Sequence, residues 1–181
     1  MLILAFDCSS PAGSVAVLEG PLVLARESLD PAQRSAKTLA PAIERSLRVA
    51  GREPREVQLI ATTVGPGSFT GLRVGVTMAK TLAYALDCDL VGLNTLDVLA
   101  AQFSQAKVLG ETGIIHAVLD AQRKELFAGR YQSSERAAEP PRRLDKGQTI
   151  LTGDSWLESL QKGDVVTGSG LIRWKDQLPA D

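Results

Sequence analysis

A short acidic and hydroxylated segment near the N-terminus carries residue types that could hold a nucleotide. Asp7, Ser9 and Ser10 follow an apolar run at residues 2–6 that is typical of a buried strand. A carboxylate at the end of a strand can orient the waters of a Mg²⁺ ion, and hydroxyl and turn N–H groups can bind phosphate oxygens. The same residue types also favour an ordinary hairpin turn. The residues alone leave both interpretations open.

A glycine-rich segment, residues 65–75, follows a predicted strand at 57–64 and leads into a predicted helix at 72–86. Glycine N–H groups at a helix start can bind an anion. The segment nevertheless lacks the lysine of a Walker A loop and the spacing of a dinucleotide-binding loop. Packing is therefore the alternative use of these glycines.

The helix at 72–86 carries two stripes, one of small side chains and one of bulky side chains. The small stripe consists of Gly71, Gly75, Ala79 and Ala83, and the bulky stripe consists of Val74, Met78, Leu82 and Leu86. A glycine inside a helix costs about 1 kcal/mol relative to alanine, so two of them indicate a steric demand. We expect the bulky stripe to cover the sheet and the small stripe to form a groove for close helix contact. The occupant could be a partner or a helix of the same chain.

Periodicity elsewhere predicts two α/β lobes. In the first half, strands are expected at 2–6, 14–18, 22–28, 57–64 and 90–93, and helices at 35–50, 72–86 and 95–104. In the second half, strands are expected at 114–119, 125–132 and 165–167, with a short helix at 156–160. Asp7 and Asp120 each follow the first strand of a half, which hints at an internal duplication. The predicted domains are residues 1–108 and 109–181.

Composition excludes several classes of function. The 181 residues carry a net charge of −1, so no overall field attracts the chain to nucleic acid or an anionic membrane. His116 is the only histidine and lies in an apolar run, and the two cysteines lack metal-site spacing, so we expect no metal site. Two unpaired cysteines, no signal-peptide pattern and no run of about 18 apolar residues predict a cytoplasmic protein without a membrane span.

Four motifs together resemble one protein family. They are Leu-Ala-Phe-Asp-Cys-Ser-Ser at 4–10, Gly-Ser-Val-Ala-Val at 13–17, the glycine-rich segment at 65–75, and Leu-Asp-Ala-Gln-Arg-Lys-Glu-Leu-Phe at 119–127. The chain resembles the bacterial TsaB (YeaZ-like) proteins of tRNA threonylcarbamoyladenosine biosynthesis, over residues 1–132 and more faintly to 170. The resemblance implies an α/β actin- and Hsp70-like ATPase (ASKHA) fold of two ribonuclease-H-like lobes, here with a shortened C-terminal lobe.

The resemblance also implies a non-catalytic role. Members of the family are understood to bind and activate TsaD, the paralogue that transfers threonylcarbamoyl to adenosine next to the anticodon of ANN-reading tRNAs. The ATPase TsaE joins them, tRNA is contacted only indirectly, and the chain alone is expected to form a homodimer. No cofactor of its own is expected, while ATP or ADP is expected in the complex. The helices at 35–50 and 72–86 would form the interface, through Leu39, Ile43, Leu47, Gly71, Arg73, Gly75, Ala79 and Ala83.

Departures from the family pattern qualify this expectation. Family members often carry a histidine where this chain has Ser35, and typical members are longer. The catalytic paralogue binds its metal through an HxxxH pair, whereas the corresponding residues 94–99 contain no histidine. That absence speaks against a metallopeptidase, and the net charge speaks against a direct tRNA-binding module. The alternative function is an ASKHA-type ATPase or phosphotransferase, with Asp7 at Mg²⁺, Ser9 and Ser10 at the phosphates, and Gly168 and Gly170 at the adenosine.

Overall fold

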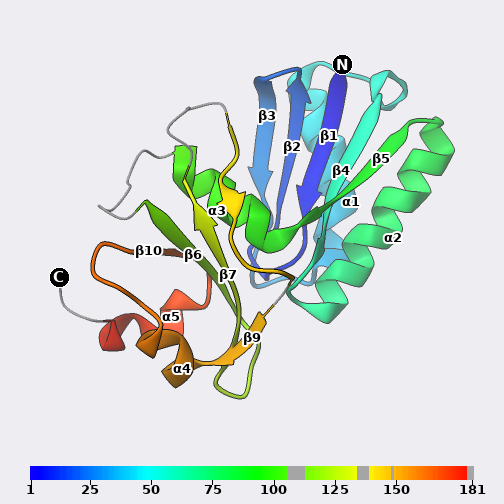
Figure 1. Cartoon of the computed structure of the whole chain (residues 1–181). Helices are drawn as coiled ribbons and strands as arrows, with labels where there is room; N and C mark the ends of the chain where they lie inside the picture. The colour runs from blue at the N-terminus through cyan, green and yellow to red at the C-terminus, as the bar shows by residue number, and fades with distance from the viewer. Residues whose placement is uncertain (106–112, 134–138, 148, 179–181) are drawn as a thin grey trace. The chain divides into compact units, whose positions relative to one another are not determined.

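The computed structural model describes residues 1–105, 113–133, 139–147 and 149–178. The chain divides into two units, Met1–Asn94 and Thr95–Asp181 (Figure 1). The predicted boundary between residues 108 and 109 lies outside the described residues, and the observed division falls earlier. Helix α3 (Thr95–Gln105) belongs to the second unit because its Leu96 and Ala100 pack against the β6 residue Ile115 and the β7 residue Tyr131.

A five-stranded sheet forms the first unit. Its strands are β1 (Leu2–Asp7), β2 (Ser14–Glu19), β3 (Leu22–Ser28), β4 (Leu59–Gly65) and β5 (Asp89–Asn94). Their order is β3-β2-β1-β4-β5, with β1 antiparallel to β2 and parallel to β4, and β4 parallel to β5. This meander followed by parallel strands is the arrangement that the strand pattern predicts, and it leaves β5 at one edge.

Two helices pack on this sheet and on each other. Helix α1 (Ser35–Ala50) contacts β2 and β3, and α2 (Phe69–Leu86) contacts β4 and β5; a 3-10 turn, η1 (Pro54–Glu56), precedes β4. Helix α1 accommodates Pro41 within its second turn and ends at Gly51, whose left-handed conformation (φ 65°) suits glycine. Helix α2 begins before residue 72 because the Ser68 side chain caps it by accepting a hydrogen bond from the Gly71 N–H.

The second unit contains a smaller sheet with helices against it. Its strands are β6 (Ile114–Asp120), β7 (Glu125–Gln132), β8 (Arg142–Arg143), β9 (Thr149–Thr152) and β10 (Val165–Thr167), in the order β10-β6-β7-β8 with β9 also on β7. The remaining helical segments are α4 (Gly153–Glu158), α5 (Leu171–Trp174) and η2 (Lys175–Gln177). Alternate residues of β6 reach two cores, because Ile115 packs with α3 whereas Val118 packs with Trp156 and Trp174. Among the described residues, no helix has both the length and the apolar character needed to span a membrane.

Candidate functional site

The small stripe of α2 faces the sheet of its own unit. A Cβ atom built on Gly71 would lie 2.0 Å from the Cys8 carbonyl oxygen, and one on Gly75 would lie 3.4 Å from the Cys8 Cβ. Ala79 is completely buried. The glycines therefore let α2 approach β1 and β4 closely. The prediction that this stripe forms a groove for another helix is wrong, because backbone and side chains of the sheet already fill the space.

The predicted interface is corrected further on α1. Three of the predicted interface residues are at most 7% exposed and belong to the core of the first unit: Leu39, Ile43 and Leu47. Ala83 of α2 is partly buried against the same core. Among the predicted interface residues, Arg73 alone is exposed. A partner that docks on these helices must therefore contact other side chains.

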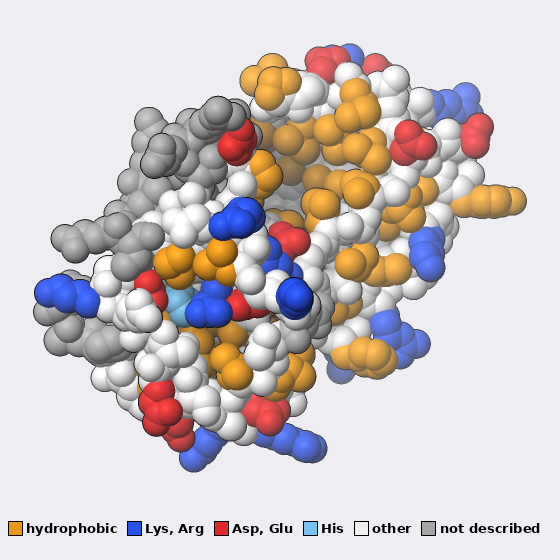
Figure 2. Space-filling view, in the orientation of Figure 1, with side chains coloured by type: hydrophobic (Ala, Val, Ile, Leu, Met, Phe, Trp, Pro, Cys, Tyr) orange, Lys and Arg blue, Asp and Glu red, His pale blue; other side chains and the backbone are white. Residues whose placement is uncertain are grey.

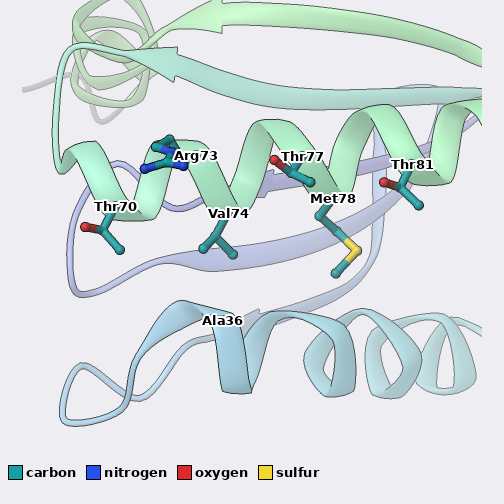
Figure 3. Close-up of a pocket in the computed structure, with 7 residues that line it drawn as sticks. All are labelled: Ala36, Thr70, Arg73, Val74, Thr77, Met78 and Thr81. Carbon is teal, nitrogen blue, oxygen red and sulfur yellow. The ribbon is translucent and has the colours of Figure 1, made fainter.

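The outer side of α2 supplies such side chains. A groove of about 440 Å³ lies between α2 and the start of α1 (Figure 3). Its lining residues are Ala36 from α1 and, from α2, Thr70, Arg73, Val74, Thr77, Met78 and Thr81. Val74 and Met78 point from α2 toward α1 (Figure 3), and both also pack on the core. Val74 and Met78 thus border the groove while they pack on the core, and the other two residues of the bulky stripe, Leu82 and Leu86, pack on the same core.

Exposed aromatic side chains lie on the same helix. Phe69 is 74% exposed and Tyr84 is 92% exposed. The Arg73 guanidinium lies 5.3 Å from the centre of the Phe69 ring, a cation–π geometry. Hydrophobic side chains also gather where β5 and α2 lie in the first unit (Figure 2). Exposed aromatic and apolar surface of this kind is typical of a protein-binding face.

A second hollow of about 590 Å³ adjoins the groove. It shares Ala36, Thr70 and Val74 with the groove and extends to Ser10, Pro11, Gln33, Arg34, Ser35, Ser68 and Gly71. The two hollows thus meet at the starts of α1 and α2. Sequence reasoning missed its threonines, although Thr70, Thr77 and Thr81 recur at helical spacing.

The predicted nucleotide residues of the first unit are tied into a local turn. One carboxylate oxygen of Asp7, Oδ1, accepts hydrogen bonds from the Ser9 N–H at 2.8 Å and from the Thr63 hydroxyl at 2.5 Å. Ser9 is buried, and its carbonyl oxygen accepts a bond from the Ser68 N–H at 2.7 Å. Ser10 lines the second hollow. The bond from Ser68 joins the turn after β1 to the start of α2, and the bond from Thr63 joins the end of β1 to β4.

The two predicted adenosine-binding glycines belong to the second unit. A Cβ atom on Gly168 would lie 2.1 Å from the Val118 carbonyl oxygen, and the Gly170 N–H donates a 3.2 Å bond to that oxygen. Gly168 also has a left-handed backbone (φ 112°). Close packing against β6 therefore accounts for both glycines.

Titratable side chains in buried positions are paired or protonated. His116 is 2% exposed, and its Nε2 atom lies 3.0 Å from the Asp164 carboxylate. Burial lowers the pKa of His116 although Asp164 opposes the shift, which fits the structural role expected for it. Burial and the Asp7 carboxylate raise the pKa of the Cys8 thiol to about 11. Within the described residues, no three His, Cys, Asp or Glu side chains gather in a way that could hold a metal ion.

Comparison with known proteins identifies relatives over nearly the whole chain. The family model described as TsaD, tRNA N6-adenosine threonylcarbamoyltransferase, matches residues 30–155. The tRNA threonylcarbamoyladenosine biosynthesis protein TsaB of Bacillus subtilis is 32% identical over 91% of this chain and 68% of its own length. The Escherichia coli TsaB protein is 30% identical over 97% of this chain and 74% of its own length.

A solved structure supports the same relationship. YeaZ from Pseudomonas aeruginosa superimposes with a TM-score of 0.79 at 25% identity, covering 99% of this chain and 81% of that protein. The predicted α/β ASKHA fold is confirmed. The chain belongs to the TsaB (YeaZ-like) family of tRNA threonylcarbamoyladenosine biosynthesis proteins.

Proposed function

We propose that this chain is a non-catalytic subunit in tRNA threonylcarbamoyladenosine biosynthesis and acts by binding the catalytic TsaD subunit. The observation that carries the proposal is the groove of about 440 Å³ between α2 and α1, whose lining residue Arg73 lies over the ring of the exposed Phe69. The groove pairs an apolar floor, which includes Val74 and Met78, with a rim of threonines and Arg73. Such a combination suits a helix of a partner protein.

The distribution of reactive side chains supports a non-catalytic role. Residues 94–99 lack the HxxxH pair by which the catalytic paralogue binds its metal. The one histidine of the chain is buried against Asp164. Asp7, the candidate carboxylate for an ATPase, accepts two hydrogen bonds from the turn that it begins and from Thr63. In this proposal, the threonylcarbamoyl transfer and its metal belong to TsaD.

The remaining features of the complex follow from the same proposal. The TsaE ATPase joins the pair, this chain contacts tRNA only indirectly, and ATP or ADP binds only in the complex. The complex works in the cytoplasm, where the tRNA substrate is. The homodimer expected for the isolated chain would use the same groove.

Co-purification tests the proposal most simply. The full chain carries an affinity tag and is co-expressed with TsaD from the same genome. We expect a stable complex of one copy of each, and modification of tRNA only when both subunits are present. Modification by the chain alone, or ATP hydrolysis by the chain alone that is lost in Asp7→Ala, would contradict a non-catalytic role.

A groove-filling variant locates the interface. Thr77 is exposed and lines the groove, so Thr77→Trp should occupy it without disturbing the core and should reduce co-purification at least about tenfold. Val49→Trp is the matched control, because Val49 is 76% exposed on α1 and does not line the groove. Equal loss in both variants would show that TsaD binds elsewhere.

A further inference from the structure

The two edges of the first sheet are built differently. Strand β3, at one edge, carries the charged residues Arg26 and Glu27, and its register with β2 shifts between Val17 and Leu18. Charged side chains and bulges are features that protect an edge strand from pairing with another chain. Strand β5, at the other edge, contains the uncharged run Leu-Val-Gly-Leu at residues 90–93, and the register shift on that side falls in β4. The edge at β5 therefore lacks the protection that β3 has.

Strand β5 leaves its outer edge open. Within the described residues it is the last strand of its sheet and pairs with β4 alone (Figure 1). Leu90, Val91 and Leu93 are all exposed, although alternate residues of a strand point to opposite faces. Helix α2 packs mainly on β4 and covers little of β5. Parallel strands are ordinarily buried on both faces, so β5 is an apolar strand in need of a neighbour.

The backbone of β5 shows which groups can bind that neighbour. The Asp89 N–H donates a 3.1 Å hydrogen bond to the Gln58 carbonyl oxygen, so the backbone groups of Asp89 face β4. In a strand the N–H and C=O groups of one residue point to the same side, and successive residues alternate. The N–H and C=O groups of Leu90 and Gly92 therefore point outward, where a further strand would pair with them.

We infer that β5 pairs with β5 of a second copy of this chain, antiparallel, about a two-fold axis at Val91. This inference goes beyond the proposed function and does not use the groove. In this register Leu90 of each copy lies opposite Gly92 of the other, so their outward backbone groups exchange hydrogen bonds. Gly92 leaves room for the Leu90 side chain, which meets the exposed Val64 beside that glycine. The edge is thus complementary to itself, as a two-fold interface requires.

The charges on β5 also fit an antiparallel pair. Asp89 of each copy lies opposite Leu93 of the other, so the two Asp89 carboxylates are at opposite ends of the paired strands. Val91 lies opposite Val91. A parallel pair in register would instead place the two Asp89 carboxylates beside each other. Because like charges directly opposite destabilise a strand pair and β-branched side chains stabilise it, the antiparallel arrangement is favoured.

A charge exchange at Val91 tests this inference. Self-association is measured by sedimentation equilibrium on the Thr77→Trp chain, whose filled groove removes any contribution from pairing through the groove. Adding Val91→Lys or Val91→Glu should lower the association constant at least about tenfold, because two like charges then lie directly opposite. An equimolar mixture of the two should recover it to within about threefold, because opposite charges then pair. The matched control is Val23→Lys, at an exposed position on β3, which should change nothing.

The outcomes separate this inference from the proposed function. A Thr77→Trp chain that stays monomeric at every concentration would overturn the pairing of β5, as would equal association of the Val91→Lys and Val23→Lys chains. Failure of the mixture to associate would overturn the antiparallel register. Binding of the catalytic subunit should be unchanged by Val91→Lys in the otherwise wild-type chain. Loss of that binding would assign the edge to the catalytic subunit and overturn pairing with a second copy.

Discussion

Helices α1 and α2 pack on one sheet through side chains of opposite size. Helix α1 inserts Leu39, Ile43 and Leu47, which are almost fully buried. Helix α2 instead places Gly71 and Gly75 against the turn after β1 and against β4. Large side chains hold a helix away from the strands, whereas glycines let the backbones approach. Side-chain size alone therefore does not identify the buried face of a helix with two apolar stripes.

This difference also explains where the groove lies. Because the small stripe of α2 packs against the sheet, Val74 and Met78 point toward α1 and border the groove. Helix α1 has a single apolar face, and that face is buried in the core. The exposed groove is therefore a consequence of the close approach of α2.

Substitution of Gly71 should have the largest effect. A Cβ atom at this position would lie 2.0 Å from a backbone oxygen that cannot rotate away. We expect Gly71→Val to lose more than about 4 kcal/mol of unfolding free energy, measured by urea denaturation. If Gly71→Val unfolds at the same urea concentration as the wild-type protein, α2 does not pack against Cys8 as described.

Truncation of a buried side chain on α1 should lower the unfolding free energy by somewhat less. Leu39 is completely buried, so Leu39→Ala should lose about 2–5 kcal/mol through lost burial and the cavity that remains. The control Val49→Ala, on the exposed side of α1, should change the unfolding free energy by less than about 0.5 kcal/mol. Equal effects at the two positions would contradict the assignment of the buried face.

Cysteine reactivity reports directly on the contact beneath α2. Cys8 is buried and its pKa is raised to about 11, so at about pH 8 only about one thiol in a thousand is ionised. Cys88 is partly exposed, and burial with its acidic neighbours raises its pKa as well. With iodoacetamide followed by mass spectrometry, we expect slow labelling of Cys88 and none of Cys8 in the native protein. If Cys8 were labelled as fast as Cys88, Cys8 would lie outside the contact with α2.

Substitution of Gly75 should have the smallest effect. An added methyl group would lie 3.4 Å from the Cys8 Cβ and 3.5 Å from the Thr62 hydroxyl, which are ordinary contact distances. Alanine also gains about 1 kcal/mol of helix propensity over glycine. We expect Gly75→Ala to leave the thermal unfolding midpoint unchanged or to raise it, with a gain in unfolding free energy of at most about 1 kcal/mol. A large loss would mean that α2 lies closer to the sheet than the structure shows.

Sequence periodicity predicted the regular elements better than their packing. The strand at 125–132 and the helix at 35–50 were predicted with the observed bounds, because a single apolar pattern marks each of them. The role of the small stripe of α2 was predicted wrongly, whereas the bulky stripe packs on the core of the first unit as predicted. Both stripes satisfy the same periodicity. What decides between them is the tertiary contact of Gly71 with Cys8, which no local pattern contains.

Two further features of the structure were not predicted, because they depend on contacts between residues that are distant in the sequence. Helix α3 was assigned to the first unit because it follows β5 in sequence, whereas Leu96 and Tyr131 place it in a core of the second. Arg73 was predicted as an interface residue and is exposed, but its groove neighbours Thr77 and Thr81 were not singled out. The binding of TsaD itself stays a prediction.

The most direct test compares the two faces of α2 in one binding experiment. The affinity of the catalytic subunit is measured by titration calorimetry for the wild-type chain, Thr77→Trp and Gly75→Ala, each shown by circular dichroism to be folded. We expect Thr77→Trp to weaken binding at least about tenfold and Gly75→Ala to leave it unchanged. Unchanged binding by Thr77→Trp, or loss of binding by a folded Gly75→Ala variant, would contradict the account.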